Sequence, residues 1–331
     1  MVGGERGSRD VEIFVTQPIP ERAAARLREV AEVRVFPETA RILPHERLLD
    51  EVRRCDVLYC MLQDRVTEEV IAAGERLRLI AASGSSPGNV AVAAATARGI
   101  PVTTIPRQAV EATADLQWGL LIAVARRIVE ADGALRRGVF PGAQSMHFVG
   151  GEVHGKTVGS IGLGEIGRAV ARRASGFGMQ VLYTKRTPLD REDERRLNVA
   201  YRSLDDLLSV SDFVVVNAGY HQGTHHLLGE RELSLMKPTA YLINTARGPI
   251  VDEAALVDAL RAGRIAGAGL DVYEHEPRLH PGLLAMDNVV LTPHIGSAAR
   301  ETRERIAASV ADNILAFLRG ERPPNLWNPM V

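Results

Sequence analysis

Arg247, Glu276 and His294 are residue types whose combination can do chemistry, and each stands at or shortly after the end of an apolar stretch. Histidine gives or takes a proton near neutral pH, and a carboxylate bonded to its imidazole favours the protonated form and fixes the tautomer. Arginine binds a carboxylate through two parallel hydrogen bonds. Any one of them alone is more often a surface or capping residue, so a catalytic role requires that all three lie on one rim of a sheet.

This combination suits the delivery of a hydride to a carbonyl carbon. The hydride leaves negative charge on the carbonyl oxygen, so an acid must supply a proton, and such a transfer typically accelerates a reaction by about 10²–10⁴-fold. We therefore predict that His294 is the general acid and base and that Glu276 orients it. Arg247 is predicted to bind the substrate's carboxylate or its adjacent carbonyl.

A glycine-rich stretch with the pattern G-x-G-x-x-G provides a candidate cofactor site. It follows the apolar stretch 157–161 and opens a helical pattern. In that context the glycines allow a tight turn, a close approach to a pyrophosphate and close helix packing, while the helix N-terminus faces the phosphates. The pattern alone is weak and could be a packing turn, but its context predicts dinucleotide binding by Gly162, Leu163, Gly164, Glu165, Ile166 and Gly167.

The residues after the next predicted strand distinguish the two nicotinamide dinucleotides. An acid about 20 residues further along the chain would bind the ribose 2′-hydroxyl of NAD. Here Thr184, Lys185 and Arg186 stand at that point, and no acid appears before Asp190. Cations attract a 2′-phosphate, which a carboxylate would repel. We predict that NADP is preferred and that NAD is possible; two solvated surface cations are the alternative interpretation.

The elements that must position these residues follow a strand–helix alternation. Four or five β-α units are expected between residues 11 and 105, followed by one long helix over Glu111–Arg137. The alternation restarts at residue 157 and continues to a final helix over Ala298–Leu318. This order predicts an α/β protein with two doubly wound parallel-sheet (Rossmann-like) domains and a cleft between them.

The same order predicts the domain boundaries. Residues 1–107 and 297–331 are expected to form the substrate (catalytic) domain, and residues 108–296 the dinucleotide-binding domain. A length of 331 residues agrees with two domains, since it is about twice that of a typical one.

Composition argues against several function classes. The chain has 40 Lys and Arg against 41 Asp and Glu, so nucleic-acid binding by bulk charge is not expected. No apolar run approaches the roughly 18 residues of a spanning helix, so no membrane span is predicted. Cys55 and Cys60, separated by four residues, predict two buried thiols in a reduced, cytoplasmic protein. The start, Met1–Asp10, is expected to be a frayed tail rather than a secretory signal.

Four stretches, in the same order along the chain, resemble motifs of the D-isomer-specific 2-hydroxyacid dehydrogenase family. Residues 158–168 resemble its cofactor fingerprint, and residues 244–256 resemble the segment that carries its catalytic arginine. Residues 269–277 resemble the segment whose last glutamate orients the catalytic histidine, and residues 292–298 the motif that holds that histidine. The resemblance covers nearly the whole chain, and within the family it is strongest to NADP-using glyoxylate/hydroxypyruvate reductases.

The resemblance implies contacts and an assembly. Asp271 and the backbone of Thr245 and Ala246 would contact the nicotinamide amide. The cofactor domain would form a homodimer, consistent with the long apolar helix expected over Glu111–Arg137. The substrate would be a small 2-oxo or D-2-hydroxy acid, with no nucleic acid or membrane as partner.

Two stretches depart from the family's pattern. The substrate loop usually reads G-x-G-x-D-N, and its backbone N–H groups grip the substrate carboxylate. Here Gly84, Ser85 and Ser86 are followed by a proline, which lacks an N–H, and by a glycine in place of the usual aspartate. The two serine hydroxyls are therefore expected to bind a carboxylate or hydroxyl instead. The second departure is Asn217–His221, where the family usually has an apolar stretch with proline near the adenine.

His221, His225 and His226 lie close together in the sequence and could suggest a metal site. We expect solvated loop histidines instead, so no metal is predicted.

Other functions use the same scaffold. Formate dehydrogenases place glutamine where Glu276 stands, and phosphite dehydrogenases need a lysine near Ser85; the chain has neither. The alternative from a different class is a dinucleotide-sensing, protein-binding module of the co-repressor type, which would need a groove for its partner. Oxidation of NAD(P)H in the presence of 2-oxo acids distinguishes the enzyme from the binding module.

Overall fold

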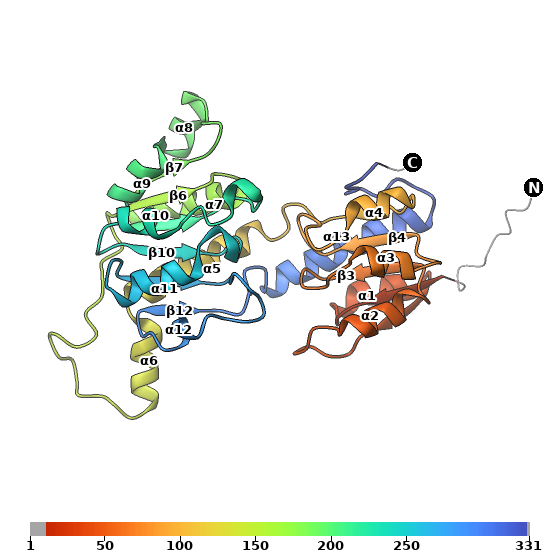
Figure 1. The fold of residues 1–331 in the computed structure, drawn as a ribbon, viewed down its shortest axis with the longest axis horizontal. Helices are drawn as coiled ribbons and strands as arrows, with labels where there is room; N and C mark the ends of the chain where they lie inside the picture. Colours follow the sequence, from red (N-terminus) through yellow and green to blue (C-terminus); the bar gives the residue numbers. More distant parts are fainter. Residues whose placement is uncertain (1–10, 330–331) are drawn as a thin grey trace, which may run out of the picture. The chain divides into compact units, whose positions relative to one another are not determined.

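The computed structural model describes residues 11–329, and the chain divides into two compact units (Figure 1). The first unit runs to Ala109 and resumes at Ala298, and the second spans Val110–Ser297. Each unit has its own parallel sheet and its own apolar core, which confirms the predicted fold class of two parallel-sheet α/β domains. The tail expected at Met1–Asp10 lies outside the described residues.

The first unit is built on a five-stranded parallel sheet in the order β2-β1-β3-β4-β5. Its strands are β1 (Glu12–Val15), β2 (Glu32–Val35), β3 (Val57–Cys60), β4 (Leu79–Ala82) and β5 (Val102–Thr103). Its helices are α1 (Glu21–Arg28), α2 (His45–Val52), α3 (Glu68–Ala73), α4 (Val92–Ala97) and α13 (Arg300–Leu318). The residues of β3 and β4 are all buried, as in strands that helices cover on both faces.

The second unit is built on a seven-stranded parallel sheet in the order β12-β11-β10-β9-β6-β7-β8. Its strands are β6 (Thr157–Ile161), β7 (Gln180–Thr184), β8 (Val199–Tyr201), β9 (Phe213–Val216), β10 (Tyr241–Asn244), β11 (Gly267–Leu270) and β12 (Val289–Leu291). Its helices are α5 (Val110–Ala125), α6 (Ile128–Arg136), α7 (Glu165–Ala174), α8 (Arg191–Leu197), α9 (Leu204–Val210), α10 (Glu230–Leu235), α11 (Glu253–Arg261) and α12 (Pro281–Leu284). Short 3₁₀ turns are η1 (Ser175–Phe177), η2 (Gln222–Thr224) and η3 (Gly248–Ile250).

The prediction of one continuous helix over Glu111–Arg137 is wrong. The chain forms two helices, α5 and α6, because Arg127 takes a left-handed conformation with φ of 52°. The carbonyl of Ala125 accepts the N–H of Gly151 at 2.8 Å instead of an N–H from the next turn of the helix. A β-carbon on Gly150 would lie 2.2 Å from the same carbonyl oxygen, so the returning chain packs directly against the break. The break depends on a segment distant in sequence, which helical periodicity cannot reveal.

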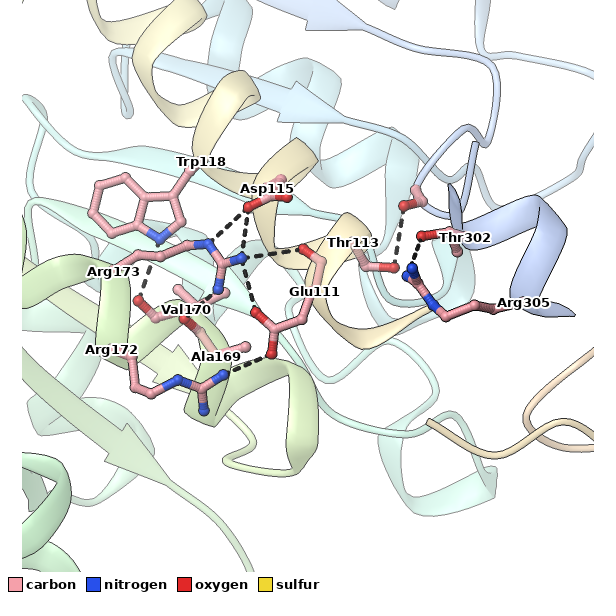
Figure 2. Close-up of polar contacts among 11 residues, drawn as sticks. Glu111, Thr113, Asp115, Trp118, Ala169, Val170, Arg172, Arg173, Thr302 and Arg305 are labelled. Carbon is pink, nitrogen blue, oxygen red and sulfur yellow. Dashed lines mark hydrogen bonds and ion pairs between the residues drawn. The ribbon is translucent and has the colours of Figure 1, made fainter. Parts of the chain in front are cut away.

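Helix α5 is attached to α7, the helix that follows the glycine loop (Figure 2). Arg173 lies 2.6 Å from Asp115 and 2.9 Å from Glu111, and Arg172 lies 2.7 Å from Glu111. The indole N–H of Trp118 donates to a backbone carbonyl of α7 at 3.2 Å. These contacts hold in place the helix whose N-terminus a bound phosphate would face.

Cys55 and Cys60 are buried free thiols, as the sequence predicts. Burial is the largest influence on Cys55 and raises its pKa to about 12, so the thiol is neutral and unreactive at physiological pH. Within residues 11–329, no helix combines the length and the apolar character needed to cross a membrane.

Candidate active site

The strands of the second unit end on one common edge, because every pairing in its sheet is parallel. β10, β11 and β12 are neighbours, and only β9 separates β10 from β6. Arg247 follows β10, Glu276 follows β11 and His294 follows β12. The topology therefore brings the three predicted catalytic residues to the edge that also carries the glycine loop after β6.

Glu276 and His294 are in direct contact. Nδ1 of His294 lies 2.8 Å from Oε2 of Glu276, whose other oxygen accepts the backbone N–H of Tyr273 at 3.0 Å. Each of the two side chains is 35% exposed, so a small molecule can reach them. Because an ionised carboxylate only accepts hydrogen bonds, Nδ1 carries a proton and Nε2 is left for another partner.

The charge of Glu276 is set by its neighbours. Burial alone would raise the pKa of this carboxyl group, but the hydrogen bond and charge of His294 outweigh burial. The Tyr273 N–H and the charge of Arg247 act in the same direction, and together they hold the pKa of Glu276 below its ordinary value. The carboxylate is therefore ionised at neutral pH and stabilises a protonated imidazole beside it.

Arg247 is half-buried on the turn after β10. Burial lowers the pKa of its guanidinium, and the opposite charge of Glu276 counteracts part of that effect. Its Nη1 donates to the carbonyl of Ala246 at 2.6 Å. Asn244 shapes the turn, since its side-chain N–H donates to the Arg247 carbonyl at 3.1 Å and its Oδ1 accepts the Ala246 N–H at 3.0 Å. The guanidinium of Arg247 is partly shielded from water and has N–H donors that are not used by this bond, so it is suited to binding a carboxylate.

Gly248 lets the Arg247 segment pack against the Glu276 segment. A β-carbon on Gly248 would lie 1.9 Å from both the carbonyl carbon and the carbonyl oxygen of Tyr273. Any other residue would therefore force the two backbones apart, and glycine at this position lets the Arg247 turn lie against the segment that leads to Glu276.

Asp271 anchors the segment that carries His294. Its Oδ1 accepts the hydroxyl of Thr292 at 2.6 Å and the N–H of Ile295 at 2.8 Å, and its Oδ2 accepts the N–H of Gly296 at 2.8 Å. The donors stand on both sides of His294, which itself has a left-handed φ of 54°. Asp271 is 1% exposed, and Oδ2 retains capacity for one further donor, which is compatible with the predicted contact to a nicotinamide amide.

The glycine loop has the backbone geometry that a dinucleotide requires. Gly162 has φ of +92°, and a β-carbon there would lie 2.7 Å from the backbone of Asn217 and Ala218. A β-carbon on Gly164 would meet no atom within 4 Å, so space for a ligand lies open at this position. A β-carbon on Gly167 would lie 2.9 Å from the carbonyl oxygen of Gly162, so glycine lets the helix pack closely against the turn. With α7 beginning at Glu165 and Leu163 and Ile166 completing the turn, these residues fit a pyrophosphate.

Asn217, in the stretch that departs from the family's pattern, supports the glycine loop. Its side-chain N–H donates to Ser160 Oγ at 3.1 Å, and Ser160 in turn donates to the Gly162 carbonyl at 2.6 Å. The backbone N–H of Asn217 also donates to the Ile161 carbonyl at 2.8 Å. An amide at this position therefore stabilises the tight turn at Gly162, an interaction that the sequence did not reveal.

Thr184 ends β7 and is half-buried, Lys185 after it is half-buried, and Arg186 is exposed. Within the described chain neither Lys185 nor Arg186 makes an ion pair or a side-chain hydrogen bond. Asp190, the first acid after the strand, is occupied as the N-cap of α8, where it accepts the N–H of Asp193 at 2.8 Å. The end of β7 therefore presents cations rather than a carboxylate.

Thr245 and Ala246 form the start of the turn after β10. The hydroxyl of Thr245 accepts the side-chain N–H of Gln117 at 2.9 Å, and Gln117 lies fully buried on α5. The N–H and carbonyl of Ala246 are both engaged, with Asn244 and Arg247 respectively. Gln117 was not predicted from the sequence, although a polar residue inside an apolar helix is a signal of such a role.

Gly84, Ser85 and Ser86, the predicted substrate loop, follow β4 in the first unit. Gly84 is buried, and its carbonyl accepts the N–H of Ile105 at 2.9 Å. Ser85 is exposed and Ser86 is half-buried. Asn89 fixes the end of the loop, because its side chain donates to the carbonyls of residues 61 and 64 at 2.8 and 2.9 Å.

The expectation of solvated loop histidines is wrong for His226. It is half-buried, and its Nε2 lies 2.7 Å from Glu274 because the chain after η2 folds back onto the segment that follows β11. His221 and His225 are exposed, as expected. Among residues 11–329, no group of three or more His, Cys, Asp or Glu side chains is arranged to hold a metal ion.

The family model of the D-isomer specific 2-hydroxyacid dehydrogenase NAD binding domain matches residues 118–296. A glyoxylate reductase of Thermococcus gammatolerans is 48% identical over 324 residues, covering 97% of this chain and 96% of that protein. A glyoxylate reductase of Pyrococcus horikoshii is 47% identical, with 97% and 96% covered.

Solved structures are similar over the same length. A protein from Thermus thermophilus has a TM-score of 0.90 and 42% identity, covering 96% of this chain and 100% of that one. The NADPH-dependent glyoxylate/hydroxypyruvate reductase of Sinorhizobium meliloti, solved with NADP and malonate, has a TM-score of 0.80 and 32% identity, covering 96% and 97%. These matches confirm the resemblance seen in the sequence motifs. The chain belongs to the D-isomer-specific 2-hydroxyacid dehydrogenases, NAD(P)-dependent oxidoreductases that act on the CH–OH group of their donors.

Proposed function

We propose that this protein reduces a small 2-oxo acid to the D-2-hydroxy acid, with NADPH preferred over NADH, and that it can run in reverse. The observation that carries the proposal is the hydrogen bond between His294 and Glu276 at the carboxyl edge of the sheet, in the unit that also holds the glycine loop. The names of the relatives support glyoxylate or hydroxypyruvate as substrates.

His294 acts as the general acid and base. Its Nδ1 is occupied by Glu276, so Nε2 is the atom that gives a proton to the substrate's carbonyl oxygen. When bound, the nicotinamide supplies the hydride that the carbonyl carbon accepts. Glu276 holds the imidazole in one orientation and, being ionised, stabilises it while it carries the proton.

Arg247 binds the substrate's carboxylate or adjacent carbonyl. A guanidinium has five N–H donors, and the bond to the Ala246 carbonyl uses Nη1. The remaining donors are suited to a carboxylate, and partial burial strengthens that attraction because less water screens it. Such binding orients the carbonyl carbon for attack and places its oxygen beside the acid.

The cofactor site lies on the glycine loop and the end of β7. Gly162, Gly164 and Gly167 shape the turn for the pyrophosphate, and Asp271 with the Thr245–Ala246 turn contacts the nicotinamide amide. The unpaired cations Lys185 and Arg186, with Thr184, bind the 2′-phosphate of NADP. Two further assignments extend the proposal: Gly84, Ser85 and Ser86 contribute to substrate binding, and the unit that contains them is the substrate domain.

We also propose a homodimer formed through the cofactor unit. Apolar side chains stand exposed on α6 and on the segment after it, and Phe140 and Met146 are 77% and 83% exposed. Isolated apolar residues are common on surfaces, but a group of this size usually marks an interface. The others are Ile128, Val129, Leu135, Val139 and Val149. Sedimentation analysis tests this, since a monomer at micromolar concentration contradicts it.

The test of the function is a panel of 2-oxo acids, each assayed with NADPH and with NADH. Glyoxylate, hydroxypyruvate, pyruvate and phenylpyruvate cover small, hydroxylated, methyl and aromatic side chains. We expect turnover of at least one of them and a higher kcat/KM with NADPH. No nucleotide oxidation with any substrate would contradict the proposal and favour the dinucleotide-sensing module. A higher kcat/KM with NADH would overturn the cofactor preference alone.

A further inference from the structure

The chain between β9 and α10 contacts the segment that follows Arg247. The backbone N–H of His226 donates to the Pro249 carbonyl at 2.8 Å, and the N–H of Leu228 donates to the Ile250 carbonyl at 3.1 Å. His226 has a left-handed φ of 50°. This conformation turns the chain so that residue 226 lies beside the Arg247 segment.

The imidazole of His226 extends the same contact to the segment that holds Glu276. Its Nε2 lies 2.7 Å from Oε1 of Glu274, and its Nδ1 lies 3.8 Å from Oδ2 of Asp252. His225 stacks on it with ring centroids 4.0 Å apart, but is itself exposed. His226 therefore links the segment after β10 with the segment after β11.

The carboxylates of Glu274 and Glu253 each accept a hydrogen bond from the other residue's backbone N–H. The N–H of Glu253 donates to Oε2 of Glu274 at 3.1 Å, and the N–H of Glu274 donates to Oε2 of Glu253 at 2.9 Å. Oε1 of Glu253 also accepts the N–H of His280 at 2.8 Å. Residues 274 and 280 lie on either side of Glu276, so these bonds fix both ends of the stretch that carries it.

The arrangement holds two carboxylates largely out of water, each against the backbone of the other residue. The Glu274 side chain is 14% exposed and Glu253 is 8% exposed. Burial alone would raise the pKa of Glu274, but the hydrogen bond from His226, the Glu253 N–H and the charges of His226 and His275 lower it overall. His226 supplies the side-chain hydrogen bond to Oε1 of Glu274, and without it that oxygen keeps only the longer ion pair with His275 at 4.0 Å.

We propose that His226 is a positioning residue for the Glu276–His294 pair, which it supports through its bond to Glu274. This inference rests on the proposed function in one respect, because it takes Glu276 and His294 to be the acid–base pair. His226 does not touch the reacting atoms in this role. It holds the backbone on which Glu276 stands, so that the carboxylate meets Nδ1 of His294.

The variants follow from the geometry of the imidazole. In His226→Asn the amide nitrogen matches Nδ1 and cannot reach Glu274, and asparagine tolerates a left-handed φ better than most residues. In His226→Gln the amide nitrogen matches Nε2, so the donor to Glu274 is retained. His45→Asn is the matched control, because it changes an exposed histidine of the first unit.

We expect His226→Asn to lower kcat about 10- to 100-fold, the scale of loss when a reacting group is misplaced by about 1 Å. The Kd for NADPH should change less than about twofold, because the glycine loop belongs to β6 and α7. His226→Gln should recover most of the kcat, and His45→Asn should match the wild type. A kcat of His226→Asn within twofold of the wild type would overturn the inference.

A double-mutant cycle separates positioning from general structural damage. If His226 acts through Glu276, then His226→Asn should cost little further kcat in a Glu276→Gln background. If the two losses of kcat multiply in the His226→Asn/Glu276→Gln double variant, the inference is contradicted. A His226→Gln variant with a kcat as low as that of His226→Asn would contradict it as well.

An NMR readout keeps the inference apart from the proposed function. The ¹⁵N shift of His294 Nδ1, assigned by its absence in His294→Ala, reports the bond to Glu276 without turnover. We expect this signal to change in His226→Asn and to return in His226→Gln. A wild-type protein that reduces no 2-oxo acid would overturn the proposed function, while an unchanged Nδ1 signal would overturn the role of His226.

Discussion

Nδ1 of His294 lies 2.8 Å from Oε2 of Glu276, so the imidazole is anchored at one nitrogen and open at the other. The contact joins the ends of β11 and β12, which are neighbours in the sheet. The pH dependence of the reaction should therefore report this pair rather than a lone histidine.

Replacing Glu276 with Gln should move the pH profile. In the direction of reduction the acid must be protonated, so the rate falls as pH rises. The low pKa of Glu276 keeps it ionised, and its negative charge favours the protonated imidazole. Without that charge the basic limb of kcat/KM should move to lower pH. An unchanged limb would show that the pairing does not matter to the reaction.

Replacing His294 with Ala should remove the acid and leave nucleotide binding intact. We expect kcat to fall by about 10²–10⁴-fold, the usual contribution of a positioned acid. The Kd for NADPH, measured by fluorescence, should stay close to that of the wild type. His45→Ala, in the first unit, is the control. A kcat near the wild-type value would remove His294 from the acid role.

Two glycines of the cofactor loop should respond differently to alanine. Gly162→Ala should destabilise the fold by about 1–3 kcal/mol, because φ of +92° is strained for other residues and the added carbon meets backbone at 2.7 Å. Gly164→Ala should leave the melting temperature nearly unchanged, since nothing lies within 4 Å of the added carbon. It should instead weaken NADPH binding about tenfold or more, by filling the space left for the pyrophosphate. Normal affinity in a folded Gly164→Ala protein would contradict the placement of the phosphate.

Replacing both Lys185 and Arg186 with Ser should raise the KM for NADPH about tenfold or more. Each cation contributes a charge-assisted bond to the 2′-phosphate. The KM for NADH should change only slightly, because NADH lacks that phosphate. Arg191→Ser, at the start of α8, is the control. Equal changes for both cofactors would mean that the two cations are ordinary surface charges.

Replacing Asp271 with Asn should both destabilise the protein and lower kcat. The carboxylate accepts three hydrogen bonds, and an amide nitrogen facing one of those donors leaves it unsatisfied, at a cost of about 1–3 kcal/mol. Because the donors lie on both sides of His294, the histidine should lose its alignment with Glu276. Thermal unfolding and kcat measured on the same sample test this, and Thr67→Ala, which removes the N-cap of α3, is the comparison. A loss of stability without a loss of kcat would contradict the alignment role.

Elements that depend on local composition can be predicted from the sequence, whereas contacts between distant segments cannot. Strands such as β3 and β9 are short, apolar and buried, so their own composition predicts them. The break between α5 and α6 depends on Gly150 and Gly151 packing against Ala125, and no pattern within the helix contains that information. His226 looked like a loop histidine because its partner, Glu274, is 48 residues away in the sequence.

By itself the sequence determined the alternation of strands and helices and the glycine turn, and it placed the three residues proposed for catalysis at strand ends. Residue types, spacing and strand ends carry that information, since parallel strands end on a common edge. Only the tertiary structure decided which groups support them. Asp271 binds the segment that carries His294, and Asn217 supports the turn at Gly162 through Ser160. Gln117 donates to Thr245, and His226 contacts Glu274. A hydrogen bond depends on distances of a few ångströms between residues far apart in the chain, and those distances exist only after the strands have assembled.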